Sequence, residues 1–311
     1  MKIHIMTDME GCAGVMNAHE YIYSNSKYYE EARDLTSLEV SAAVEGALEA
    51  GATEVLVADG HGPSAIKRTL LHPRARLLSG RPYSPGQPSF GCDGTFAASL
   101  IIGQHAKANT DGGHLCHTIS FGVEDYNLNG RSIGELGLWM LIAGYYNVPV
   151  IMVSGDQAAC DEARSLVPNI EVAPVKWGLK RGSASGLTKE QNGVFNSVAV
   201  HLHPNEARAV IREHVSRAVR RIPEITPFRV DAPYTLTIST RPVEGEKHGE
   251  KMTLKSADFL DLMRGLTQPP KAAVRPSRAA KPAAAKKPKA AKKPAAAKAA
   301  KPAGRKGRKK R

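Results

Sequence analysis

Short apolar runs of strand type alternate with longer helical stretches through most of this chain. This alternation is the pattern of an α/β fold in which helices cover a largely parallel sheet. The carboxyl ends of parallel strands meet at one edge of a sheet, and open α/β folds bind their ligands at that edge. We therefore predict a layered, mostly parallel sheet with flanking helices.

Apolar and β-branched clusters predict strands at residues 3–7, 54–58, 75–78, 99–103, 150–153 and 170–172. Helical spacing of apolar and small residues predicts helices at 27–50, 134–145, 157–166 and 206–221. Beyond Pro223 the pattern changes to a strand at 234–239 and a helix at 257–266. This change indicates a smaller α+β subdomain at the C-terminal end, with a boundary near residue 190.

Charge is distributed very unevenly along the 311 residues. The net charge is +13, yet residues 271–311 hold 17 Lys and Arg without any Asp or Glu, so the preceding part is at −4. Those last residues are rich in Lys, Ala and Pro and resemble the C-terminal tails of linker histones. Because they lack aromatic residues, we predict a body at 1–268 and a disordered basic tail at 269–311. The tail either binds nucleic acid or another polyanion through counterion release, or only adds solubility.

The sequence also indicates a compartment. It has no run of 18 apolar residues, and acidic residues at Asp8 and Glu10 come too early for a signal peptide. No C-x-x-C spacing connects the four cysteines. We expect a cytoplasmic protein that does not enter a membrane and keeps its thiols reduced.

Metal-capable side chains follow three of the predicted strands. Asp8 and Glu10 come directly after the first strand, and residues two apart in an extended segment point to the same side. Asp59 and His61 follow the second strand, and Gln104–His105 follows the strand at 99–103. A single such residue is usually a turn or capping group, but three strand ends together predict a shared site.

Glu135 and two histidines have competing interpretations. Leu128–Arg131 predicts a two-residue hairpin turn, and the Ser132-x-x-Glu135 spacing that follows favours a capping box for Glu135. His114 and His117 form an i, i+3 pair, and spacing alone leaves each of them a structural residue or a catalytic one.

The types of donor in this set limit which metal could bind and which class of reaction could follow. Carboxylates with imidazoles suit zinc, manganese or iron better than calcium, and their number suits a two-metal site. The chain has no H-E-x-x-H pair and no phosphate-binding G-x-x-x-x-G-K-[ST] loop, and Gly182–Gly186 has Ala where a nucleophile elbow needs Ser. Metal-assisted hydrolysis is the reaction class that remains.

Five short motifs and one further anchor resemble, in order and spacing, the D-aminopeptidases of peptidase family M55, the DppA type. The resemblance extends to about residue 265 and is most specific over the first 160. The segments that carry it are Asp8–Gly14, Val57–His61, Gly103–Ala106, Cys116–Ile119, Gly134–Gly137 and Ala143–Pro149.

The resemblance implies a zinc-dependent aminopeptidase that removes N-terminal D-amino acids from short peptides by a two-metal activated water. It implies a catalytic role for His117 as base, acid or nucleophile, and it implies a homo-oligomer, a ring-shaped decamer in the family. For Glu135 it reverses the local preference for a capping box. The metal ligands that it implies are Asp8, Glu10, His61, His105 and Glu135, with Asp8 as our choice for the bridge between two zinc ions.

Two other functions stay open on sequence grounds. A two-metal phosphoesterase or nuclease would use the basic tail, although it would need a richer Asp and His pattern. A non-enzymatic nucleoid-associated protein would bind through the tail alone and would have no need for an intact set of ligands.

Overall fold

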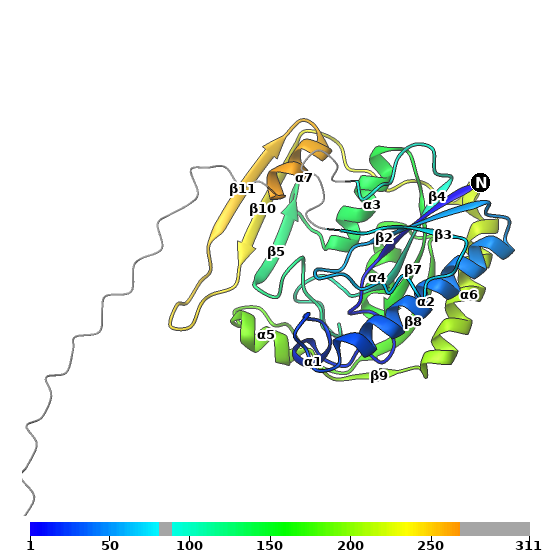
Figure 1. The fold of residues 1–311 in the computed structure, drawn as a ribbon. Helices are drawn as coiled ribbons and strands as arrows, with labels where there is room; N and C mark the ends of the chain where they lie inside the picture. Colours follow the sequence, from blue (N-terminus) through cyan, green and yellow to red (C-terminus); the bar gives the residue numbers. More distant parts are fainter. Residues whose placement is uncertain (81–88, 268–311) are drawn as a thin grey trace, which may run out of the picture. The chain divides into compact units, whose positions relative to one another are not determined.

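The protein is described by a computed structural model over residues 1–80 and 89–267 (Figure 1). Seven strands form the main sheet in the order β3-β2-β1-β4-β7-β8-β9, and among them β9 alone runs antiparallel to its neighbour. The strands are β1 (Lys2–Thr7), β2 (Glu54–Asp59), β3 (Ala75–Leu78), β4 (Ala98–Gln104), β7 (Val150–Asp156), β8 (Glu171–Gly178) and β9 (Ala199–His201).

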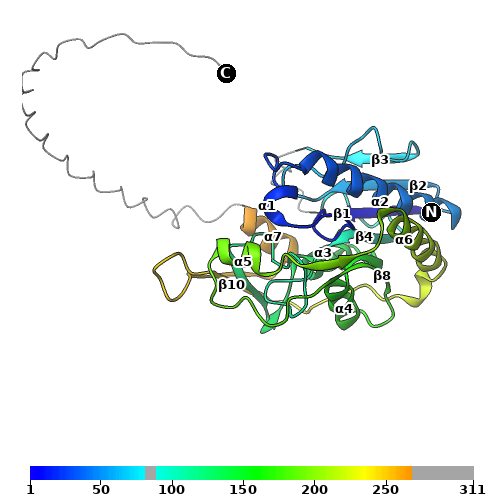
Figure 2. The ribbon, with the colours of Figure 1, turned by 90° about the horizontal axis from the view of Figure 1, so that it is seen from below.

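Two pairs of helices cover this sheet, one pair on each face (Figures 1 and 2). The pairs are α2 (Tyr29–Glu49) with α6 (Pro204–Arg220), and α3 (Glu135–Tyr145) with α4 (Gln157–Leu166). A Cβ at Gly46 would lie 2.3 Å from the Arg212 carbonyl oxygen, so the close approach of α2 and α6 requires glycine there. The shorter elements are α1 (Ala18–Tyr21), α5 (Lys189–Phe195) and the 3₁₀ turn Ile222–Glu224.

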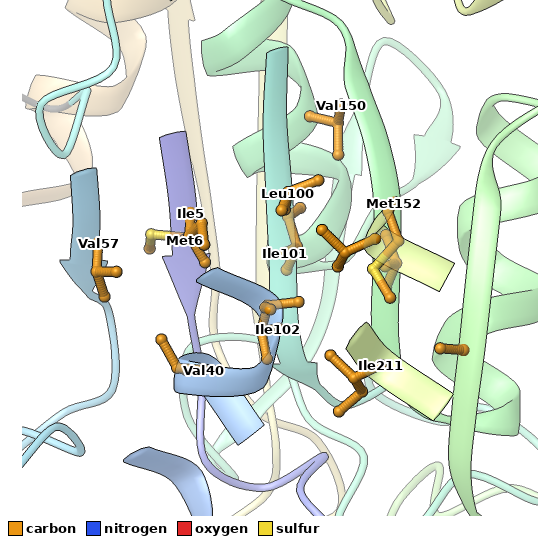
Figure 3. Close-up of a cluster of buried hydrophobic side chains, with 14 of the residues drawn as sticks. Ile5, Met6, Val40, Val57, Leu100, Ile101, Ile102, Val150, Met152 and Ile211 are labelled. Atoms are coloured by element: carbon orange, nitrogen blue, oxygen red, sulfur yellow. The ribbon is translucent and has the colours of Figure 1, made fainter. Parts of the chain in front are cut away.

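The core lies between the sheet and its helices. Every residue of β4 and β7 is buried, which is the burial expected of central parallel strands covered on both faces. Figure 3 shows Leu100 and Met152 of these strands, with Val40 from α2 and Ile211 from α6 packed beside the sheet. This packing makes the central strands a rigid support for the loops at their carboxyl ends.

A second, antiparallel sheet has the order β11-β10-β5-β6. Its strands are β5 (Val123–Leu128), β6 (Arg131–Ser132), β10 (Tyr234–Thr240) and β11 (Lys251–Ser256), and α7 (Phe259–Thr267) packs on it. The hairpin predicted at Leu128–Arg131 is confirmed, because Asn129 and Gly130 take the positive φ values, 50° and 89°, that a two-residue turn of this kind needs.

The predicted fold class is confirmed, and most predicted elements begin and end within three residues of the observed ones. The strand predicted at 170–172 is longer than expected and continues to Gly178. Residue 190 lies inside α5, and the second sheet takes strands from both sides of it. The predicted tail at 269–311 falls outside the described residues. In the described part of the chain no helix is both long and apolar enough to cross a membrane.

Candidate metal centre

The predicted meeting of three strand ends is present in the structure. Strands β2, β1 and β4 are neighbours in the sheet, and their carboxyl ends lead into the segments that hold Asp8, His61 and His105. These three residues and Glu10 are at most 6% exposed. The site is therefore a buried cluster at the sheet edge where α/β folds bind ligands.

The backbone after β1 lies directly against the end of β4. The Gly11 amide donates to the Gly103 carbonyl at 2.7 Å, and a Cβ at Gly103 would be 2.3 Å from the Asp8 carbonyl oxygen. Gly103 also has φ of +79°, a conformation that favours glycine. These glycines let the segment with Asp8 and Glu10 approach the segment with His105.

Asp8 lies between two groups of donors. Its Oδ1 is 3.3 Å from Nδ1 of His61, and that nitrogen is 3.0 Å from Oε2 of Glu10. Its Oδ2 is 3.2 Å from Nε2 of His105, and that nitrogen is 3.2 Å from Oε1 of Glu135. Each oxygen of one carboxylate thus faces a different imidazole and carboxylate pair.

Backbone carbonyls orient the three imidazoles. Nε2 of His61 lies 2.9 Å from the Ile22 oxygen, and Nδ1 of His105 lies 2.9 Å from the Ala106 oxygen. For His117, Nδ1 lies 2.8 Å from the oxygen of Leu115. A carbonyl oxygen can only accept, so each of these nitrogens carries a hydrogen and the other nitrogen of each ring is left for the site. Metal-ligating histidines have this arrangement.

Glu135 reaches the cluster from the first position of α3. The capping box that its local spacing favours is absent, because Gly134 is the N-cap residue and makes no side-chain cap. The Ser132 hydroxyl instead donates to Asp125 at 2.6 Å. Oε2 of Glu135 accepts a hydrogen bond from the Ile119 amide while Oε1 faces His105. The local prediction is wrong because these long-range partners outcompete the Ser132 amide.

His117 lies at the edge of the cluster. Its ring stacks on His105 with centroids 3.8 Å apart and on Phe121 at 4.2 Å, and its Nε2 is 3.9 Å from Oε1 of Glu10. Burial, with the neighbouring His105, lowers the pKa of His117 to about 4, so this imidazole is neutral near pH 7.

Two other candidate residues have different surroundings. His114 is fully buried and its Nε2 donates to the Met16 carbonyl at 2.9 Å, away from the carboxylates of the cluster. Asp59 accepts hydrogen bonds from the Ser64 hydroxyl and the Ala65 amide, and so orders the loop after β2.

The charges of the cluster balance one another. Burial, with the neighbouring Glu10, raises the pKa of Asp8 to about 7. Burial opposes charge at His105 and His61, but Glu135 and Glu10 respectively raise their pKa values well above the ordinary one. Burial likewise opposes ionisation of Glu10, yet His61 holds its pKa well below the usual range. A metal ion would take the place of the imidazole protons, which is the usual coupling of metal binding to proton release.

The donors fit a transition-metal site. Among the described residues, two sets of buried donors have ligand atoms within 4.8 Å of one another: Asp8, Glu10 and His105, and His105, His117 and Glu135. Carboxylates mixed with imidazoles suit zinc, manganese and iron.

Sequence reasoning missed several buried polar residues behind the cluster. Asp156 follows the predicted strand at 150–153, so the strand-end rule could have found it; it accepts hydrogen bonds from the amides of His114 and Ala159. Lys176 and Glu39 are also buried, but they lie inside a strand and a helix where no motif distinguishes them.

Comparison with known proteins gives consistent results. A profile of the family described as Peptidase_M55, D-aminopeptidase, matches residues 1–253. The D-aminopeptidase of Bacillus subtilis (strain 168) is 38% identical over 196 residues, which is 62% of this chain and 70% of that protein. The solved structure of the Zn-dependent D-aminopeptidase DppA from Bacillus subtilis, described as a self-compartmentalizing protease, is similar with a TM-score of 0.74. The match has 29% identity and covers 86% of this chain and 96% of the other.

Proposed function

Because the chain belongs to the Peptidase_M55 family of D-aminopeptidases, we propose that it removes N-terminal D-amino acids from short peptides at a site for two zinc ions. Membership of this family makes the protein a metallo-aminopeptidase. The observation that carries the two-metal proposal is the placement of Asp8, whose oxygens face separate imidazole and carboxylate pairs.

The contacts of the two Asp8 oxygens divide the five proposed ligands between two ions. Glu10 and His61 lie on the Oδ1 side of Asp8, and His105 and Glu135 lie on its Oδ2 side. Asp8 would then help to hold both ions. Three carboxylates offset much of the charge of two divalent ions, which favours retention of both ions in a buried site.

Zinc bound there would supply a Lewis acid for the peptide carbonyl and would lower the pKa of a water molecule. We propose that the imidazole of His117 accepts the proton of that water molecule. Its Nδ1 hydrogen is held by the Leu115 carbonyl, so Nε2 carries the free lone pair and lies on the side of Glu10. We assign Nε2 of His117 the role of general base.

Burial limits the substrates. The six candidate residues are between 1% and 8% exposed, so only a thin, unfolded chain end can reach them. The neighbour described as self-compartmentalizing supports the further proposal that this chain forms a homo-oligomer that encloses its sites. Light scattering on purified protein tests this, and a monomer at all concentrations would contradict it.

One assay distinguishes the candidate activities. Purified protein is analysed for bound metal and then given a dipeptide with N-terminal D-alanine, the matching L-peptide and bis(p-nitrophenyl) phosphate. We expect zinc and release of D-alanine, and we expect H105A to lose both. His248 is exposed, so H248A is a matched control for removal of an imidazole. Phosphodiester hydrolysis without D-alanine release would favour the phosphoesterase, and zinc-loaded protein with neither activity would contradict the peptidase.

The basic C-terminal residues carry a separate proposal. The 17 positive charges of residues 271–311 suit non-specific contact with nucleic acid or another polyanion. Truncation after Thr267 should abolish DNA retardation at low salt and leave peptide turnover unchanged. A full-length variant with those lysines and arginines changed to glutamine is the control, and retardation by either variant would contradict the proposal.

A further inference from the structure

The loop at residues 11–16 follows Asp8 and Glu10 directly, and side chains from four separate parts of the chain bind its backbone. Two of them accept from loop amides and two donate to loop carbonyls. Glu39 Oε1 accepts from Ala13 at 2.8 Å, His201 Nδ1 accepts from Gly14 at 3.1 Å, Lys176 Nζ donates to the Val15 oxygen at 2.9 Å, and His114 Nε2 donates to the Met16 oxygen at 2.9 Å.

Lys176 is unusual within this group. Its side chain is fully buried, and within the described part of the chain no carboxylate lies within 4.0 Å of its ammonium. Burial lowers its pKa to about 8. A buried amine without a carboxylate strongly destabilises a fold unless it is hydrogen-bonded. The Val15 carbonyl supplies that bond, so Lys176 and this loop depend on each other.

Two further members of the group have atoms that the fold leaves unsatisfied. Oε2 of Glu39 and Nδ1 of His114 are buried and make no hydrogen bond of ordinary geometry in the described part of the chain, although the Cys12 thiol and the Ser197 backbone lie near them. Apolar side chains of similar size would fill the same space without this unfavourable desolvation. Stability of the core alone therefore does not account for these polar residues.

The position of the loop connects them to the metal centre. On one side, the Gly11 amide is bound to the end of β4 through the Gly103 carbonyl. Residues 13–16 of the loop are bound by the four side chains. One of these, His114, also lies three residues before His117 in the sequence. Gly14 has φ of +86°, and a Cβ there would be 2.8 Å from Leu35, so this path of the loop requires glycine at that position.

We propose that Glu39, His114, Lys176 and His201, the loop clamp, are positioning residues that hold the 11–16 loop so that Asp8 and Glu10 keep the geometry needed to bind zinc. This inference rests on the proposed zinc centre. The four side chains bind the backbone of residues 13–16, so the loop clamp acts through the backbone. Residues that orient ligands in this way typically change metal affinity by about 10-fold to 100-fold when they are replaced.

His201 offers the most direct test, because it lies half-buried on the edge strand β9 and its replacement should leave the fold intact. H201L removes the acceptor for the Gly14 amide. H201N keeps an acceptor oxygen close to the position of Nδ1. We expect H201L to weaken zinc binding about 10-fold, measured by competition with a chromophoric chelator, and H201N to recover most of the loss.

Lys176 has a matched control on the same strand. Glu171 begins β8 and pairs with Arg217 and Arg221, remote from the loop. K176M should weaken zinc binding by about 10-fold to 100-fold, whereas E171Q should leave it unchanged even if both variants lose thermal stability. Equal loss of affinity in K176M and E171Q would overturn the proposal, because affinity would then follow global stability.

A second readout does not need zinc. Hydrogen exchange of peptides that cover residues 11–16 is measured in the zinc-free protein, and we expect faster exchange in H201L and K176M but not in H201N or E171Q. Unchanged exchange and unchanged zinc affinity in H201L would overturn the role of the loop clamp. A wild-type protein that binds zinc but releases no D-amino acid would contradict the proposed function and leave this test valid.

Discussion

Two clusters of carboxylates and cationic side chains differ in this molecule, one at the carboxyl ends of β1, β2 and β4 and one along the seam between β8 and α6. At the seam, Glu171 pairs with His214 at 2.8 Å, Arg217 at 2.8 Å and Arg221 at 3.1 Å. The arginines are about one-third to one-half exposed. In the metal centre the partners of the carboxylates are imidazoles, and every member is buried.

The two clusters differ in whether their cationic groups can lose a proton. At the seam two of the three partners of Glu171 are guanidinium groups, which do not lose their protons, so these two ion pairs stay charged and solvent weakens them. An imidazole can release its proton and bind a metal through the same nitrogen. In the buried cluster every cationic partner is an imidazole, so this cluster can exchange protons for metal ions, and the loss of one charge there leaves others uncompensated.

Loss of the shared carboxylate should have the largest effect. D8N removes charge from both proposed zinc positions but keeps the size of the side chain. We expect zinc content to fall to less than one ion per subunit and kcat for D-alanine release to fall by about 1,000-fold, equivalent to about 4 kcal/mol. Metal analysis and initial rates measure this. Retention of two zinc ions by D8N would contradict the bridge.

Removal of His117 should separate chemistry from metal binding. H117A is expected to keep its zinc and to lose about 100-fold to 10,000-fold in kcat, because a general base contributes about that much. Zinc analysis together with steady-state kinetics distinguishes a loss of catalysis from a loss of metal. Loss of zinc in H117A would instead make His117 a ligand, as its membership of a second donor group permits.

A buried histidine outside both clusters should control stability in acid. Burial lowers the pKa of His4 from 6.5 to about 4. Between these pH values the unfolded chain binds more protons than the folded one, so stability falls as the pH drops, by about 3 kcal/mol in total. H4Q should unfold in urea with a weaker dependence on pH, with H248Q as the control. Parallel profiles for H4Q and wild type would refute this.

The seam should give the smallest effect. E171Q breaks partly exposed ion pairs, and we expect it to lower the free energy of unfolding by about 1 kcal/mol or less, with no change in zinc content or kcat. Urea denaturation in low and high salt measures this, because salt should reduce the difference. A loss comparable to that of D8N in any of these measurements would remove the distinction between the two regions.

Sequence patterns predicted much of the fold because the central strands carry their own signal. Segments such as 150–153 are continuously apolar since both faces of β7 are covered. By contrast, β11 lies at the edge of the second sheet and alternates exposed and partly buried residues. Its sequence therefore indicates the pairing with β10 less clearly than an apolar run indicates a central strand. Likewise, β5 pairs with β10 more than 100 residues away, which no local pattern predicts.

The candidate site likewise contains residues that sequence patterns could place and one that they could not. Asp8, Glu10, His61 and His105 follow strand ends, so the rule for parallel sheets was enough to predict that they would lie close together. Glu135 could not be placed by local reasoning, because Ser132 and Glu135 match a capping box and only the fold brings the Ile119 amide and His105 to this carboxylate.

The sequence by itself determined the α/β class, the metal-capable side chains that follow three of the strands, and the contrast between a body at −4 and a strongly basic C-terminal segment. These are properties of residue type and spacing, which local physical chemistry dictates. Tertiary structure alone decided that each oxygen of Asp8 faces its own imidazole, and that Glu39, His114, Lys176 and His201 meet on one loop. Such contacts join residues up to 187 positions apart, and only the packing of the whole sheet brings them together.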